Sequence, residues 1–291
     1  MKYIKNIIPL IVCGIVLASL TCKREEGQHG NTNTITGPSI FGHTCTDLST
    51  IPMEWIDSVK AKIKVHYAHT SHGQQLIIGL EGIESQNPAY SVAVGHCSLP
   101  NEPGALCIFD GQEDEDYVTP DLYWATEEGM NKTRAVLRNH PEINVSMWAW
   151  CTQLDWYSEE ETRTYLDSLT KLAREFPNVT FVFFTGNAQA LDAEGYNRYL
   201  RNQQIRQYCM EHHFPCFDFG DLDAWYFNGS SWEQATYEYN GVLVPHEHPR
   251  YQEGEQTEGH ANYLSCEQKG KAVWWMLARI AGWPGSQEEN N

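Results

Sequence analysis

Apolar and polar positions along the chain fall into blocks that predict strands and helices in turn. Strands are predicted at 63–68, which is rich in β-branched residues, and at 144–150. The continuous apolar run at 179–184 is typical of a strand inside a parallel sheet, and a shorter strand is predicted at 215–219. Apolar positions recur at helical spacing over 53–62, 74–82, 124–138, 158–176, 196–212 and 267–281. This alternation indicates βαβ units and therefore an α/β fold, a three-layer α/β/α sandwich around a mostly parallel central sheet.

Two long segments lack such a pattern. Residues 87–122 contain four prolines with scattered glycines and acids, which predicts an irregular excursion. Residues 220–262 are aromatic and acidic without a clear period. No repeat or internal linker divides the chain, so we predict one domain over 53–285 and a disordered tail at 286–291.

The N-terminus is typical of an exported protein. Two lysines precede an apolar run over 7–20 that is short for a bilayer span, so residues 1–21 are predicted to be a signal peptide. The junction with Cys22 resembles a bacterial lipobox, and the charged residues 23–26 resemble the export tag of Bacteroidetes lipoproteins. The resemblance implies a lipid anchor on Cys22 in the cell envelope, at the periplasmic or surface face of the outer membrane. An ordinary secretory signal is the alternative. Residues 22–52 are expected to form a flexible tether.

Charge narrows the classes of partner. The formal net charge of −18 makes nucleic acid and anionic lipid surfaces poor partners, so a membrane would be contacted only through the lipid anchor. Neutral or acylated carbohydrate remains electrostatically acceptable, and ten Trp and fifteen Tyr offer stacking surface.

Seven cysteines follow Cys22, and an odd number leaves at least one thiol free. The sequence-local pairs Cys97 with Cys107 and Cys209 with Cys216 are the predicted disulfides. No two cysteines are separated by just two residues, so a zinc-ribbon pattern is absent, and we predict neither a structural metal nor a cofactor.

Candidate chemistry gathers just past the predicted strands, where open α/β sheets bind ligands. Four stretches qualify: 69–73, 151–153, 186–187 and the loop 255–262. Ser71 lies where a strand, a polar turn and a helix meet, which can expose its hydroxyl beside free backbone N–H groups. Ser71 is therefore the candidate nucleophile, with helix capping as the alternative role.

The order of elements over about residues 60–282 resembles that of the SGNH hydrolases, a family related to the GDSL esterases. His-Thr-Ser-His-Gly around Ser71 is similar to the His-His-Ser-x-Gly block of a divergent branch, and Gly-His-Ala-Asn at 259–262 resembles the closing block. The resemblance implies a flavodoxin-like sandwich in which Ser71 attacks an ester and His260 moves the proton.

The same resemblance implies donors for the oxyanion. These are the backbone amides of Ser71 and Gly73 with the side chain of Gln153, which element order favours over Asn187. Ordinary turn hydrogen bonding is the alternative for both amides.

The position that holds the family's triad Asp is Thr257 here, which leaves Glu258 and Glu255 as possible partners of His260. The remaining candidates for lining the pocket are His69, His72 and Asn262.

These features predict an exported serine esterase that removes an acyl group, such as acetyl, from a carbohydrate. A first alternative is a non-catalytic glycan-binding surface lipoprotein on the same fold. A second is a metal-dependent hydrolase that uses His246 and His248, although Pro245 and Pro249 bracket that pair and favour a loop.

Overall fold

A computed structural model describes residues 40–285 and shows a seven-stranded sheet in which all strands are parallel. The strand order is β1 (Ile40–Phe41), β7 (Cys216–Phe217), β6 (Thr180–Phe184), β5 (Val145–Trp148), β2 (Lys64–Ala68), β4 (Leu106–Asp110) and β3 (Val92–His96). The central strands are almost wholly buried on both faces, as the continuous apolar run at 179–184 predicted for β6.

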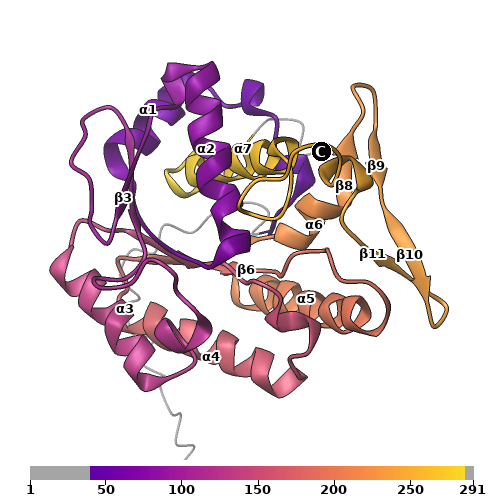
Figure 1. The fold of residues 1–291 in the computed structure, drawn as a ribbon. Helices are drawn as coiled ribbons and strands as arrows, with labels where there is room; N and C mark the ends of the chain where they lie inside the picture. The colour runs from indigo at the N-terminus through magenta and orange to yellow at the C-terminus, as the bar shows by residue number, and fades with distance from the viewer. Residues whose placement is uncertain (1–39, 286–291) are drawn as a thin grey trace, which may run out of the picture. The chain divides into compact units, whose positions relative to one another are not determined.

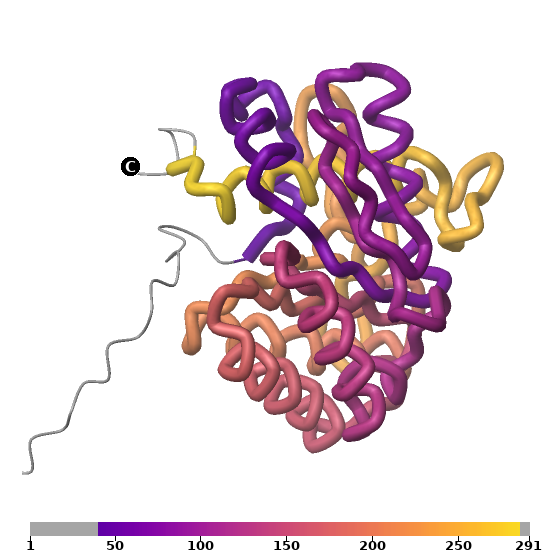
Figure 2. The backbone as a smooth tube through the Cα atoms, turned by 90° about the vertical axis from the view of Figure 1, so that its left-hand side faces the viewer, coloured from indigo at the N-terminus to yellow at the C-terminus, as the bar shows by residue number. Residues whose placement is uncertain are grey.

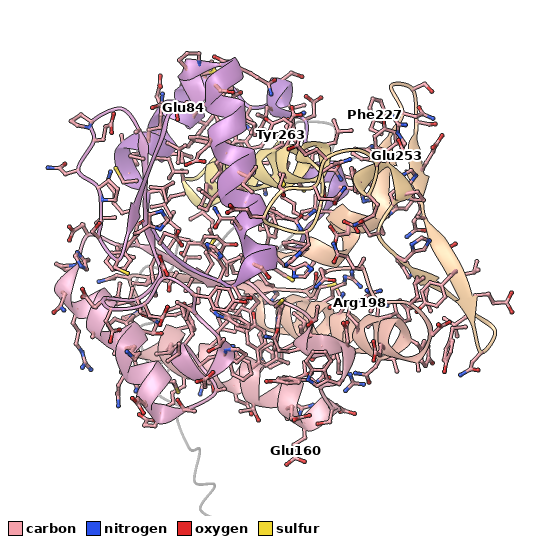
Figure 3. All side chains as sticks on the ribbon, in the orientation of Figure 1. Glu84, Glu160, Arg198, Phe227, Glu253 and Tyr263 are labelled. Atoms are coloured by element: carbon pink, nitrogen blue, oxygen red, sulfur yellow. The ribbon has the colours of Figure 1, made fainter. Side chains whose placement is uncertain are left out.

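Helices cover both faces of the sheet, which confirms the predicted three-layer α/β/α sandwich (Figures 1 and 2). One layer contains α1 (Met53–Lys62), α2 (Gln74–Gln86), α6 (Phe219–Ala224) and α7 (Tyr263–Ile280). The other contains α3 (Glu127–Asn139), α4 (Glu159–Glu175) and α5 (Asp192–His212). Side chains fill the space on both sides of the sheet (Figure 3).

Helices α2 and α7 touch through their backbones because two glycines lie at the crossing. A Cβ on Gly79 would lie 1.9 Å from the carbonyl oxygen of Cys266, and one on Gly270 would lie 2.6 Å from the carbonyl carbon of Gly79. This close approach fixes the start of α2, which follows Ser71, against the loop that precedes α7.

The prediction for residues 87–122 was wrong, because β3 and β4 lie inside this segment. Every residue of β4 is buried, and β4 pairs with β2 on one side and with the edge strand β3 on the other. The four prolines lie outside both strands, where they break no ladder hydrogen bond.

The predicted tether also ends earlier than expected. Ile40 pairs with Cys216 at the edge of the sheet, and Phe41, Cys45 and Ile51 are buried, so residues 40–52 belong to the folded domain. The signal peptide 1–21, the anchor Cys22 and the tail 286–291 lie outside the described residues. Within residues 40–285, no helix is long and apolar enough to cross a membrane.

The aperiodic segment 220–262 forms two antiparallel hairpins beside the main sheet, shown in orange in Figure 1. The first joins β8 (Trp225–Phe227) to β9 (Trp232–Gln234), and the second joins β10 (Thr236–Tyr239) to β11 (Val242–Pro245). The strands of both hairpins are too short for an alternation of apolar and polar residues to be recognised in the sequence.

The predicted disulfides Cys97–Cys107 and Cys209–Cys216 are absent, because these four cysteines are free thiols. Cys209 and Cys216 nevertheless lie in hydrogen-bond contact, and burial, followed by this neighbour, raises the pKa of the Cys216 thiol.

Candidate functional site

Three reactive side chains meet at the carboxyl ends of the adjacent strands β2 and β5. Ser71 and His72 lie in the turn between β2 and α2, and Cys151 follows β5. The Sγ atom of Cys151 lies 3.1 Å from Nδ1 of His72 and 3.7 Å from Oγ of Ser71. A thiol, an imidazole and a hydroxyl are therefore in direct contact where open parallel sheets place their ligands.

The opposite edge of the His72 ring is held by Gln189, which follows β6. Oε1 of Gln189 lies 2.9 Å from Nε2 of His72, while Nε2 of Gln189 donates to the carbonyl of His260 at 2.7 Å and to Glu247 at 3.4 Å. Because the amide nitrogen is turned toward these acceptors, Oε1 accepts a hydrogen bond from Nε2 of His72. The proton that His72 can exchange is therefore on Nδ1, which faces the thiol.

Electrostatics favours the ion pair of a thiolate and an imidazolium. Burial by itself would raise the pKa of the Cys151 thiol, but the hydrogen bond and charge of His72, with smaller effects of Ser71 and Thr70, lower this pKa to about 6. Burial likewise opposes protonation of His72, yet its contacts with Cys151 and Gln189 raise the pKa of the imidazole above its usual range. Lowered thiol pKa values of this kind accompany nucleophilic cysteines.

Two of the predicted oxyanion residues hold the main chain of Cys151. The backbone N–H of Cys151 donates to Oε1 of Gln153 at 2.9 Å, and Nδ2 of Asn187 donates to the carbonyl of Cys151 at 2.6 Å. Asn187 therefore positions the Cys151 peptide through one of its two amide N–H donors. The Gln153 side chain fixes the same peptide.

Gly73 likewise differs from its expected role. Its backbone N–H donates to the carbonyl of Thr70 at 3.1 Å, so this group is not free for an oxyanion. The N–H groups of Ser71 and His72 open the helical turn and have no acceptor one turn earlier within it. A Cβ on Gly73 would lie 2.2 Å from Cβ of His69, which explains the glycine.

His260 lies beside His72 rather than bonded to Ser71. The ring centroids of His260 and His72 are 4.8 Å apart, and among the described residues no hydrogen bond joins His260 to Ser71 or to Glu258. Burial, followed by the charge of His72, lowers the pKa of His260. Its backbone carbonyl accepts a hydrogen bond from Gln189.

A pocket of about 270 Å³ lies next to Ser71. His69 is in its wall with both ring nitrogens engaged: Nδ1 donates to the carbonyl of Thr70 at 2.7 Å, and Nε2 lies 3.0 Å from Oδ1 of the buried Asp110. Glu258 lies on its exposed rim. His69 and Glu258 therefore line the pocket, as predicted for His69.

The other predicted residues lie outside this pocket. Asn262 caps α7, accepting from the Ser265 N–H while its amide donates to the carbonyls of Arg250 and Glu253. It thus shapes the loop before α7 and does not line the pocket.

The rings of His246 and His248 pack against the tyrosine rings of the hairpins, which gives no support to a metal site between them. The described residues contain no group of three or more His, Cys, Asp or Glu side chains arranged to hold a metal ion.

A buried network of charged side chains contacts Gln189 and the segment that holds it. Glu247 is only 5% exposed, and burial, followed by the charge of Asp223, raises its pKa to about 7. Asp223 accepts from the N–H of Ala188 at 2.8 Å and pairs with the fully buried Lys269 at 2.6 Å. The segment that holds Gln189 is therefore anchored by charged side chains in the core.

Sequence reasoning assigned no catalytic role to Cys151, Gln189 or Glu247. The signal for Cys151 was its place directly after a central strand, beside the strand that precedes His72. The roles of Gln189 and Glu247 depend on contacts between distant loops, which no local pattern of residues indicates.

Comparison with known proteins assigns no family to this site. No model of a known protein family matches the chain, and no curated protein matches it.

Proposed function

We propose that the protein is an acyl hydrolase in which Cys151 is the nucleophile and His72 its acid and base. The observation that carries this proposal is the contact of 3.1 Å between Sγ of Cys151 and Nδ1 of His72, with the opposite ring nitrogen held by Gln189. A nucleophile, a base in hydrogen-bond reach and a third group that orients the base make up the general pattern of a covalent hydrolase.

The chemistry proceeds in two balanced steps. The Cys151 thiolate attacks the carbonyl carbon of an ester, and the alcohol leaves with the proton from Nδ1 of His72, which gives a thioester on Sγ. His72 then takes a proton from water as the water attacks the thioester, and the acid leaves as the thiolate and imidazolium are restored. The backbone N–H groups of Ser71 and His72, which open the helical turn, are the donors that we propose for the oxyanion.

Ser71 remains a second candidate nucleophile, as the SGNH resemblance implies. The observation in its favour is that Ser71, and not Cys151, lines the pocket of about 270 Å³. We favour Cys151 because no hydrogen bond joins Ser71 to an imidazole in the described part of the chain.

The substrate that we propose is an acylated carbohydrate with a small acyl group such as acetyl. The pocket beside Ser71 has a volume of only about 270 Å³, which suits a short acyl chain, and the net charge of −18 disfavours anionic esters.

Hydrolysis of p-nitrophenyl acetate and butyrate tests the proposal. We expect Cys151→Ala to abolish hydrolysis and Ser71→Ala to retain most of it, with acetyl trapped on Cys151 in the intact mass of acid-quenched enzyme. Ser71 becomes the nucleophile if Ser71→Ala is inactive while Cys151→Ala stays active. The proposal of an acyl hydrolase is refuted if neither variant loses hydrolytic activity. It is also refuted if the wild-type protein hydrolyses neither of the two esters nor acetylated xylan.

A further inference from the structure

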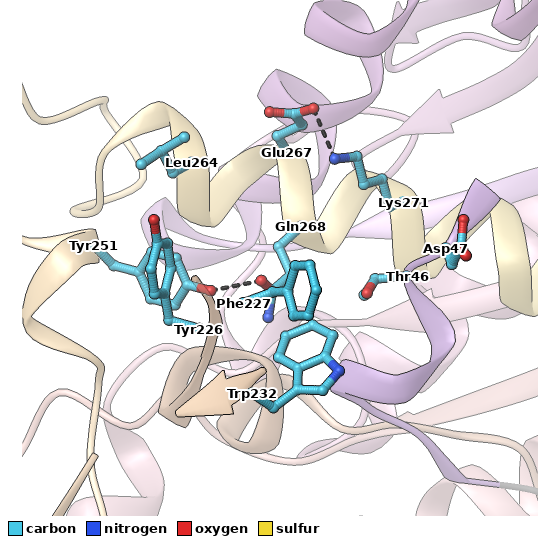
Figure 4. Close-up of a pocket in the computed structure, with 10 residues that line it drawn as sticks. All are labelled: Thr46, Asp47, Tyr226, Phe227, Trp232, Tyr251, Leu264, Glu267, Gln268 and Lys271. Carbon is cyan, nitrogen blue, oxygen red and sulfur yellow. Dashed lines mark hydrogen bonds and ion pairs between the residues drawn. The ribbon is translucent and has the colours of Figure 1, made fainter. Parts of the chain in front are cut away.

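A second cavity lies away from Cys151, between the β8–β9 hairpin and the first half of α7 (Figure 4). It is a groove of about 620 Å³, within the range of small-molecule sites, and residues 46–47 close one end. None of the residues argued above to act in hydrolysis lines it.

One wall of the groove is aromatic. It consists of Tyr226, Phe227 and Trp232 from the hairpin, and Phe227 is 47% exposed. The Trp232 ring is fixed in place, because it packs edge-on to His43 at 4.9 Å between centroids and tilted against Phe227 at 5.3 Å. Such an exposed apolar wall beside polar residues is typical of a binding surface.

The facing wall is polar and held in place. Glu267 and Lys271, one turn apart on α7, form an ion pair at 2.9 Å, and both remain partly exposed to the groove. Figure 4 shows this pair on the helix across from the rings of Phe227 and Trp232. It therefore offers fixed hydrogen-bond donors and acceptors without a net charge.

The side chain of Gln268 at the base of the groove is hydrogen-bonded through both its nitrogen and its oxygen. Nε2 of Gln268 donates to the carbonyls of Leu222 and Trp225, and its Oε1 accepts from the hydroxyl of Tyr251 at 2.5 Å. These contacts tie the hairpin to α7, so the two walls are preformed rather than assembled by a ligand.

We propose that this groove binds a neutral carbohydrate, with a sugar ring stacked on Trp232 and Phe227 and its hydroxyls toward Glu267 and Lys271. A sugar ring has an apolar face of C–H groups and a rim of hydroxyls, which matches the two walls. A purely apolar ligand would bury the Glu267–Lys271 pair without replacing its water. An anionic ligand would meet Asp47 and a chain of net charge −18.

This binding site does not depend on the proposed hydrolysis. It predicts that the protein holds a polysaccharide through the groove whatever reaction takes place at Cys151.

Titration calorimetry of the full-length protein with neutral hexasaccharides of β-1,4-glucan, xylan, mannan and chitin tests the proposal. At least one should bind, with Trp232→Ala and Phe227→Ala each weakening the affinity by at least tenfold. Phe227 is exposed enough for its truncation to leave the fold intact. The matched control is Trp156→Ala, which removes a tryptophan that is 62% exposed and does not line the groove.

Binding of no hexasaccharide, or binding that survives both groove variants, overturns the proposal. Binding of palmitate in their place would overturn it as well, in favour of an apolar ligand. Hydrolysis of p-nitrophenyl acetate should be unchanged in Trp232→Ala, which separates a failure of the groove from a failure of the Cys151 site.

Discussion

The contact between His72 and Cys151 should set the pH dependence of the thiol's reactivity. The pKa of Cys151 is about 6 rather than the ordinary 9.0, and His72 lowers it against the opposing effect of burial. In His72→Gln the positive charge is gone and the burial remains, so the pKa of Cys151 should return to about 9 or above.

The size of the effect follows from two opposing factors. At about pH 6 roughly half of a thiol with pKa 6 is ionised, against about 0.1% of one with pKa 9, a ratio of about 500. The more acidic thiolate is less nucleophilic, by a factor of about 20 for three pKa units and a Brønsted coefficient near 0.45. Wild type should therefore be alkylated about 25-fold faster than His72→Gln at about pH 6, and the order should reverse above about pH 8.

The assay is alkylation by iodoacetamide, followed at the peptide that contains Cys151 by mass spectrometry from acid to alkaline pH. Cys97 is an internal reference in the same sample, because burial, followed by the charge of Asp116, raises the pKa of its thiol. A wild-type midpoint near that of an ordinary thiol, or a midpoint that His72→Gln leaves in place, would refute the assigned role of His72.

Three further predictions concern the framework of the site. Gly79→Ala should lower the free energy of unfolding by more than about 2 kcal/mol in urea titrations, because the new Cβ would meet the backbone carbonyl of Cys266; an unchanged midpoint would contradict the close helix crossing. Lys269→Met should cost about 3–5 kcal/mol by the same measurement because it leaves Asp223 buried without its partner, and the double variant with Asp223→Asn should recover part of that loss. Burial, followed by the charge of Asp223, raises the pKa of Glu247 to about 7, so its folded-state stabilisation is present in acid and is lost as pH rises through about 7. The stability of Glu247→Gln relative to wild type should therefore improve between about pH 5 and about pH 8, and a difference that is flat with pH would show that Glu247 does not titrate in this range.

The pattern of the sequence could predict the layers of the fold because apolar and β-branched stretches alternate with segments of helical spacing. It failed at β3 and β4, where the surrounding segment is rich in prolines, and at Ile40–Phe41, where the strand has two residues. A two-residue strand has no period, and only its pairing with β7 identifies it. The location of the site was predictable because the ends of adjacent parallel strands must meet at one edge of the sheet.

The identity of the activated group was not predictable in the same way. Ser71 and Cys151 both follow strands, and a pattern of residues cannot tell which of them faces a ring nitrogen able to take a proton. That depends on which edge of the His72 ring is already occupied, and the occupant is Gln189, 117 residues further along the chain. Gln189 is itself turned by the His260 carbonyl and by the buried Glu247. The orientation of one amide, fixed by contacts between three loops, thus directs Nδ1 of His72 to the thiol of Cys151, and this contact is the reason that we propose sulfur as the nucleophile.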